Sequence, residues 1–157
     1  AKMTNMKQIT IKVAWNNSAF EGLVSSETSY GEMKIVTKDF NDIIDMGEAE
    51  LKIGFDGYTE FGLELPEWYK NKEYEFVYKF QDVTAMLKAY SSYVSLAAIS
   101  RETGINSALL SHYANGLKVP RNKQQKIIVS GLHRIGALLS KCTIDDERKT
   151  QLNIERK

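Results

Sequence analysis

The sequence holds little of what marks secreted, membrane-spanning or metal-binding proteins. Its single cysteine, Cys142, excludes an internal disulfide and offers no thiol set for a metal ion. No apolar run approaches the roughly 18 residues that a membrane-spanning helix needs, so we expect no membrane partner. Residues 1–8 are polar, whereas a signal peptide requires an apolar core. These absences together predict a cytoplasmic protein.

Catalytic groups are scarce as well. Both histidines, His112 and His133, fall in the C-terminal half, and no recognisable motif surrounds the cysteine. The sequence therefore contains no evident pair of nucleophile and base. We expect no catalytic residues, no cofactor and no enzyme activity, and we expect His133 to be structural.

One alternative rests on carboxylates. Four of them recur at three-residue intervals: Asp39, Asp42, Asp45 and Glu48. Ribonuclease H active sites use clustered carboxylates with metal ions, which makes a metal-dependent nuclease one hypothesis. Steps of three residues drift around a helix instead of converging, however, and acidic residues also suit a helix N-terminus. We interpret the four as a solvated face and expect no metal site.

The net charge of +1 conceals an asymmetry along the chain. Residues 1–90 contain 10 Lys and Arg against 15 Asp and Glu, whereas residues 91–157 contain 11 against 5. A run after Gly116 holds four basic residues and no acidic one: Lys118, Arg121, Lys123 and Lys126. An acidic half joined to a basic half is typical of a protein of which one part meets nucleic acid.

The first half predicts a small α+β layer. Apolar and polar residues alternate over residues 6–15 and 74–80, and residues 20–25 and 33–37 indicate two further short strands. From Phe40, apolar residues recur at three- and four-residue steps, which indicates a helix that begins at an Asp39 cap. Three glycines weaken this helix and allow a kink or break: Gly47, Gly54 and Gly57. The predicted order is β-β-β-α-β, with the helix on one sheet face.

The second half is predicted to be entirely helical. Asp82, Ser95 and Asn106 suit the caps of three successive short helices. A long helix then opens at Asn122 and carries one apolar face, made of Ile127, Ile128, Leu132, Ile135, Leu138 and Leu139. The charged residues 143–157 are expected to form a flexible tail.

The segment from Ser95 to Gly116 carries the most specific signal. Two short helices joined by a tight turn that begins with glycine define a helix-turn-helix unit. Gly104 supplies the positive φ that the turn requires, and Ile105 is the apolar plug after it. Ala97 is expected where the first helix approaches the second closely. The predicted core between the two helices consists of Ile99, Leu110 and Tyr113.

Together with its Asn-Gly ending and the basic, proline-containing loop that follows, this segment resembles the lambda-repressor/Cro-like helix-turn-helix family over roughly residues 82–142. The resemblance implies that the front of the third helix reads bases and that the flanking turn and loop bind phosphates. Carried over position by position, the base-reading residues are Asn106, Ser107, Ala108, Ser111 and His112. The phosphate-binding residues are Ser95, Asn115, Lys118, Arg121 and Lys123. The reading side chains are short, so we expect phosphate contacts to supply most of the affinity.

A β-β-β-α-β layer followed by such a unit also resembles the HicB-type antitoxins. The helix that begins at Asp39 and its exit through Leu65-Pro66 are similar to that family's helix and exit. The resemblance implies a reduced ribonuclease H-like layer over residues 1–80, used for dimerisation or for a partner. A helix-turn-helix domain over residues 81–142 and a tail over residues 143–157 follow it.

Three functions follow, in decreasing order of support. The first is a sequence-specific transcriptional regulator, such as a repressor, that binds double-stranded DNA as a homodimer or higher oligomer through its N-terminal domain. The second is the antitoxin of a HicA/HicB-like pair, which neutralises a small toxin ribonuclease and represses its own operon. The third is the metal-dependent nuclease. The aromatic strand over residues 74–80 is expected to be core or dimer surface.

Overall fold

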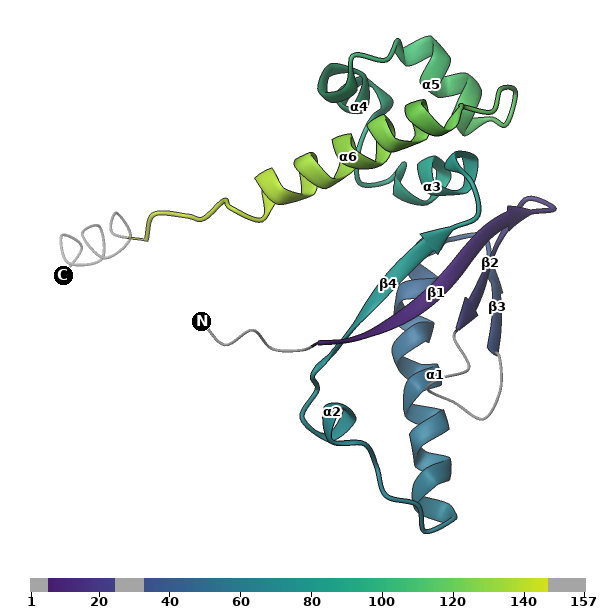
Figure 1. The fold of residues 1–157 in the computed structure, drawn as a ribbon, viewed down its shortest axis with the longest axis vertical. Helices are drawn as coiled ribbons and strands as arrows, with labels where there is room; N and C mark the ends of the chain where they lie inside the picture. Colours follow the sequence, from purple (N-terminus) through teal and green to yellow (C-terminus); the bar gives the residue numbers. More distant parts are fainter. Residues whose placement is uncertain (1–5, 25–32, 147–157) are drawn as a thin grey trace, which may run out of the picture.

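The structure, a computed structural model, describes residues 6–24 and 33–146. It confirms the predicted α+β class: a four-stranded mixed sheet is followed by a run of helices (Figure 1). Strands β1 (Lys7–Asn16), β2 (Ala19–Val24) and β3 (Met33–Thr37) pair antiparallel. Strand β4 (Tyr74–Phe80) lies parallel to β1, so that the strand order is β3-β2-β1-β4.

One face of the sheet is covered by the long helix α1 (Phe40–Glu60). The alternation along β1 places Ile9, Ile11 and Val13 on this face, where each is at most 1% exposed. Ile43 and Leu51 of α1 pack against them and are equally buried. The period-2 pattern of the strand and the longer period of the helix therefore meet in one apolar core, as predicted.

The glycines of α1 produce no break. The helix begins at the predicted Asp39 cap, whose carboxylate accepts from the Asn41 backbone N–H at 2.9 Å, and it continues past all three glycines to Glu60. Gly47 is buried against the sheet, where a Cβ would lie 3.1 Å from Ile11 Cδ1. The glycine thus lets the helix axis approach β1 closely, and packing against the sheet offsets its low helix propensity.

Five further helices complete the described chain. A short helix that the sequence did not reveal, α2 (Glu67–Lys70), follows Pro66 and precedes β4. Helices α3 (Val83–Tyr90), α4 (Leu96–Thr103), α5 (Ser107–Ala114) and α6 (Asn122–Leu139) follow β4. Their second core is made of Val83, Met86, Leu87, Ile99, Ile105, Leu110, Tyr113 and Ile128.

The two cores meet at α3. Ala89 belongs to the core of the sheet, whereas Leu87 belongs to the core of the helices. Phe80 and Tyr90 pack against both. The Tyr93 hydroxyl, just after α3, also donates to the side-chain oxygen of Asn41 in α1. The predicted boundary near residue 80 therefore runs through packed side chains.

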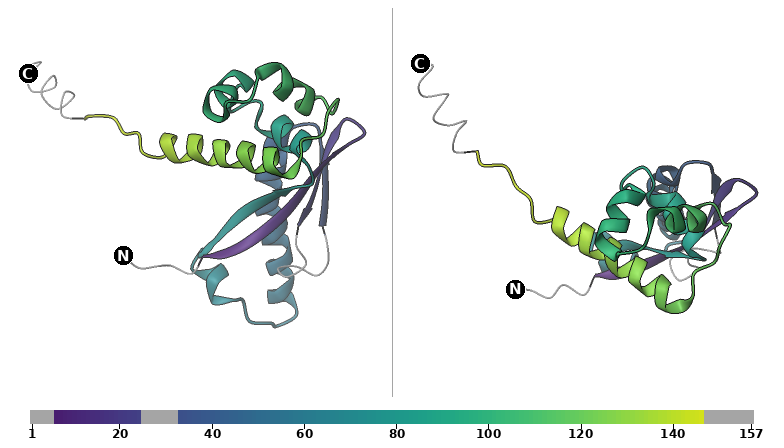
Figure 2. Two further views of the ribbon diagram at one scale, coloured as in Figure 1. Left: turned by 45° about the horizontal axis from the view of Figure 1, so that its top comes forward. Right: turned by 90° about the horizontal axis from the view of Figure 1, so that it is seen from above.

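The predicted apolar face of α6 is buried only in part. Ile128 is fully buried, but Leu138 is 71% exposed and Leu139 is 61% exposed. Figures 1 and 2 show the reason: the C-terminal half of the helix extends past α4 and α5. Residues 143–146 are not helical, and the rest of the predicted flexible tail, residues 147–157, lies outside the described residues.

Within the described ranges, no helix combines the length and the apolar character that crossing a bilayer requires.

Candidate nucleic-acid interface

The turn between α4 and α5 is held by local hydrogen bonds. Gly104 ends α4 with φ of 76°, the left-handed conformation that glycine adopts at least cost. The Thr103 hydroxyl donates to the Ile99 carbonyl at 2.6 Å and accepts from the Ile105 N–H at 3.2 Å. Ile105 is 6% exposed and fills the predicted apolar position. These contacts set the direction in which α5 leaves α4.

One residue of this unit was assigned wrongly. Ala97 is exposed, so it is not the point at which α4 approaches α5. Ser100 lies on the inner side instead, where its hydroxyl donates to the Ile105 carbonyl at 2.5 Å. Ser100 precedes Gly104 by four residues, which places it one helical turn before the αL cap and on the face toward the turn. That spacing, counted back from the glycine, would have identified it.

Helix α5 is anchored by its inner face. Leu110 is fully buried and Tyr113 is 6% exposed, as predicted, and both pack with Ile99 of α4. The Thr84 hydroxyl of α3 donates to the Tyr113 carbonyl at 2.7 Å and holds the C-terminal end. The outer face of α5 therefore has a defined orientation at the end of the molecule remote from α2 (Figure 1).

The five predicted base-reading residues share this outer face. Asn106, Ser107 and Ala108 are exposed at the front of α5, and Ser111 and His112 are half-buried one turn further on. The Asn106 carboxamide oxygen accepts from the Ala108 N–H at 2.8 Å, so its role as N-cap is confirmed. Because this oxygen is engaged in the cap and the residue is exposed, its amide NH₂ is the group that can donate to a ligand. The front of the helix thus presents one amide donor, one hydroxyl and one methyl group.

Four of the predicted phosphate-binding residues follow the same helix. Asn115, Lys118, Arg121 and Lys123 are all exposed on the chain between α5 and the first turn of α6. The backbone N–H groups of Leu117 and Lys118 donate to the His112 carbonyl at 2.9 and 3.4 Å, which holds the start of this loop against α5. The fifth, Ser95, caps α4 by accepting from the Ala98 N–H at 3.0 Å and lies apart, at the start of α4.

Two further features belong to this surface. Leu117 and Val119 flank Lys118 and are 71% and 82% exposed, so the basic loop also carries an apolar surface. Residues 104–144 contain no Asp or Glu at all, a signal that was available in the sequence. The whole segment from the turn to beyond α6 is therefore free of negative side chains, which favours contact with a polyanion.

Three of the four carboxylates considered for a nuclease make hydrogen bonds within the N-terminal layer. Asp39 caps α1, Asp42 accepts from the Thr37 hydroxyl at 2.5 Å, and Glu48 accepts from the Tyr74 hydroxyl at 2.9 Å. In the part of the chain that the structure describes, no three Asp, Glu, His or Cys side chains gather into a set that could hold a metal ion.

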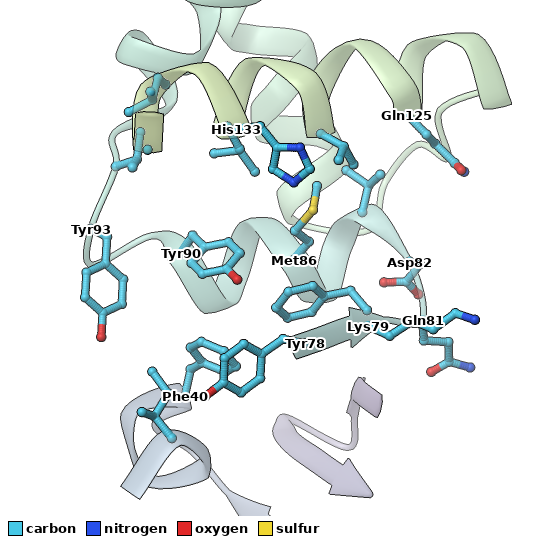
Figure 3. Close-up of a pocket in the computed structure, with 18 of the residues that line it drawn as sticks. Phe40, Tyr78, Lys79, Gln81, Asp82, Met86, Tyr90, Tyr93, Gln125 and His133 are labelled. Atoms are coloured by element: carbon cyan, nitrogen blue, oxygen red, sulfur yellow. The ribbon is translucent and has the colours of Figure 1, made fainter. Parts of the chain in front are cut away.

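His133, expected to be structural, is exposed on α6 and points into a groove that α6 forms with α3 and β4 (Figure 3).

Comparison with known proteins finds no matching family model, no matching curated protein and no matching solved structure.

Proposed function

We propose that the chain is a sequence-specific DNA-binding transcriptional regulator that acts as a dimer. The observation that carries the proposal is the composite surface of α5 and the loop after it. Short polar side chains at the exposed front of a firmly anchored helix adjoin a loop with three exposed cations. Such a helix fits the major groove, where side chains reach base edges while the flanking cations bind phosphates.

The electrostatics of the α6 N-terminus support the same surface. The first turn of α6 leaves backbone N–H groups without partners in the helix, and it contains no acidic residue. Arg121 is the N-cap of α6, Lys123 lies in its first turn, and both are exposed. The partial positive charge of the helix end therefore adds to that of the two side chains, which favours a DNA phosphate.

The first test is selection of binding sites from random DNA, followed by affinity measurements on the selected and on unrelated duplexes. We expect Arg121→Ala to weaken binding to both by a similar factor, because a phosphate contact carries no sequence information. Lys70→Ala, a matched change of an exposed cation on α2 at the other end of the molecule, should leave both affinities unchanged. If no duplex is enriched, or if the two variants behave alike, the proposal is wrong.

Asn106 allows a sharper test, because its two roles can be separated. Asn106→Asp keeps a good N-cap, so the free energy of unfolding should stay within about 0.5 kcal/mol. It also replaces an amide donor with a negative charge on the surface that meets DNA, so affinity should fall by roughly tenfold or more. Asn71→Asp, which introduces the same charge near α2, is the control. An unchanged affinity for Asn106→Asp would place the DNA elsewhere.

A second candidate function, the antitoxin, draws support from the N-terminal layer. The strand order β3-β2-β1-β4, with β4 parallel to β1 and α1 on one face, is compatible with the reduced ribonuclease H-like layer that the HicB-type resemblance implies. The test is co-expression with a small basic protein encoded beside this chain. Stable co-purification, together with inhibition of that protein's ribonuclease activity by this chain, would add this function to DNA binding.

A further inference from the structure

The strand β4 forms an open edge of the sheet. It stands last in the strand order β3-β2-β1-β4, and no strand of the described chain runs along its outer side (Figure 1). The Glu73 carbonyl and the Gln81 N–H, at its two ends, bond to β1 at 2.9 and 2.8 Å. Because backbone groups alternate in direction along a strand, the odd-numbered residues of β4 face β1 and the even-numbered residues face outward.

The outward backbone groups of β4 are free to pair. Among the described residues, no hydrogen bond outside the ladder with β1 involves the backbone of the even-numbered residues, which are Tyr74, Phe76, Tyr78 and Phe80. Every residue of the strand is exposed or half-buried. The strand contains no proline, and its register with β1 is unbroken. A regular edge of this kind is a template for a further strand.

The charges of β4 suit a second copy of the same strand. Glu75 and Lys79 lie two residues before and two residues after Val77, on the sheet face opposite α1. Both are exposed, and neither forms an ion pair with a described residue. In an antiparallel pair centred on Val77, Glu75 of each copy stands directly opposite Lys79 of the other. Opposite charges in this position stabilise strand pairing.

A lysine pair beside this edge favours the same partner. Lys79 stands directly opposite Lys12 in the ladder between β4 and β1, and both side chains are exposed. Like charges in this arrangement destabilise a sheet, and no described carboxylate forms an ion pair with either lysine. Glu75 of a second copy would lie on the other side of Lys79 and offset the repulsion.

The backbone register agrees with the charges. A pairing centred on Val77 sets outward-facing residues opposite one another, so that each such pair can exchange both of its hydrogen bonds. The side chains of these pairs are aromatic on both strands, and the pairs are Tyr74 with Phe80 and Phe76 with Tyr78. The other border strand, β3 (Met33–Thr37), offers no such match, because it contains no carboxylate to oppose Lys34.

We propose that β4 pairs antiparallel with β4 of a second copy of this chain, across a two-fold axis at Val77, and joins the two sheets into one. The contact is isologous, because the same strand supplies both of its sides. The proposal deepens the proposed function by naming the dimer surface, and it rests on that function only for its biological use.

Exchange of the two charges tests the register. In analytical ultracentrifugation of the full chain without DNA, we expect a dimer. Glu75→Lys and Lys79→Glu should each raise its dissociation constant by roughly tenfold, because like charges then face each other at two symmetric places. The double variant restores opposite charges and should return to within about threefold of the wild-type value.

Lys38→Glu is the matched control for these variants. It reverses an exposed charge that directly follows β3, at the other border of the sheet, so it should leave the dissociation constant unchanged. Circular dichroism checks that every variant folds, which the exposed positions favour.

A covalent test does not depend on charge. Val77 faces its own copy in a pair without hydrogen bonds, whose Cα atoms lie about 4.5 Å apart, within reach of a disulfide. Val77→Cys in a Cys142→Ser background should therefore give a disulfide-linked dimer on mild oxidation. Thr10→Cys in the same background is the control and should remain unlinked. Thr10 is the neighbour of Val77 on β1, but three strand spacings of about 4.8 Å separate it from its copy.

The proposal is wrong if the wild-type chain is monomeric at micromolar concentration. It is also wrong if the single charge changes leave the dimer intact, if the double variant dimerises no better than they do, or if Val77→Cys stays unlinked. A dimer with no affinity for DNA would overturn the proposed function alone, whereas a DNA-binding monomer would overturn this proposal alone.

Discussion

At the residue scale, the Tyr74 hydroxyl is the contact whose effect on stability can be followed by pH. It joins β4 to α1 by donating to the Glu48 carboxylate at 2.9 Å. Burial, together with this hydrogen bond, raises the pKa of Tyr74 to about 12 from its ordinary 10.0. The neutral phenol is thus favoured in the folded chain, and its contribution is fully present below pH 10 and is lost as the pH rises to 12.

We therefore expect the free energy of unfolding to fall between about pH 10 and 12, because the unfolded chain releases its phenolic proton first. Tyr74→Phe should lose about 1 kcal/mol at pH 9 and show a shallower fall above pH 10. Urea unfolding of both chains at pH 9 and 11 measures the loss of stability and the size of its fall with pH. Part of the fall in the free energy of unfolding should remain in the variant, because burial also raises the pKa values of Tyr78 and Tyr90. Equal slopes for the two chains would show that Tyr74 is not the responsible group.

At the scale of elements, α4 and α6 approach each other closely at Gly131. Gly131 of α6 faces Thr103 Cγ2 so closely that any Cβ would overlap it, at 2.5 Å. We expect Gly131→Ala to destabilise the fold by about 2 kcal/mol in urea unfolding, because a methyl group is forced into a filled space.

The cause can be isolated with a second substitution. Thr103→Ser removes the overlapping methyl group but keeps the hydroxyl that donates to the Ile99 carbonyl. The double variant Gly131→Ala and Thr103→Ser should recover at least half of the loss, as a double-mutant cycle would report. Ser130→Ala, an exposed neighbour, should change stability by less than about 0.5 kcal/mol. If the two changes have additive effects on the free energy of unfolding, the contact between position 131 and Thr103 is not the cause of the loss.

At the scale of the whole molecule, the proposed dimer sets the salt dependence of DNA binding. Lys118, Arg121 and Lys123 of two copies place six cations against phosphates. Each neutralised phosphate contributes about −0.9 to the slope of log affinity against log salt, so we expect a slope of about −5. Arg121→Ala should make it shallower by about 2. Fluorescence anisotropy over a salt series measures the slope, and a value near zero would contradict an electrostatic interface.

Much of the fold was predictable because it depends on contacts close in sequence. The caps at Asp39, Asp82, Ser95 and Asn106 each bond a backbone N–H two or three residues on. Gly104 takes the positive φ of its turn. The alternation of β1 and β4 and the long apolar period of α1 likewise follow from strand and helix geometry alone. The residues of the candidate interface followed instead from the resemblance to a known helix-turn-helix family, carried over position by position along the same segment.

The tertiary structure decided what depends on distant neighbours. The sequence by itself determined the approximate position of each helix and strand except α2, and which residues can stand on the outer face of α5. Only packing showed that Gly47 lets α1 approach β1 closely, that Ser100 and not Ala97 supports the turn, and that α3 belongs to both cores. Packing likewise left the end of α6 uncovered, where Leu138 and Leu139 are exposed and Leu139 lines an aromatic groove. The physical reason is that burial is a property of what lies opposite a side chain, and the chain brings those partners from far along its length.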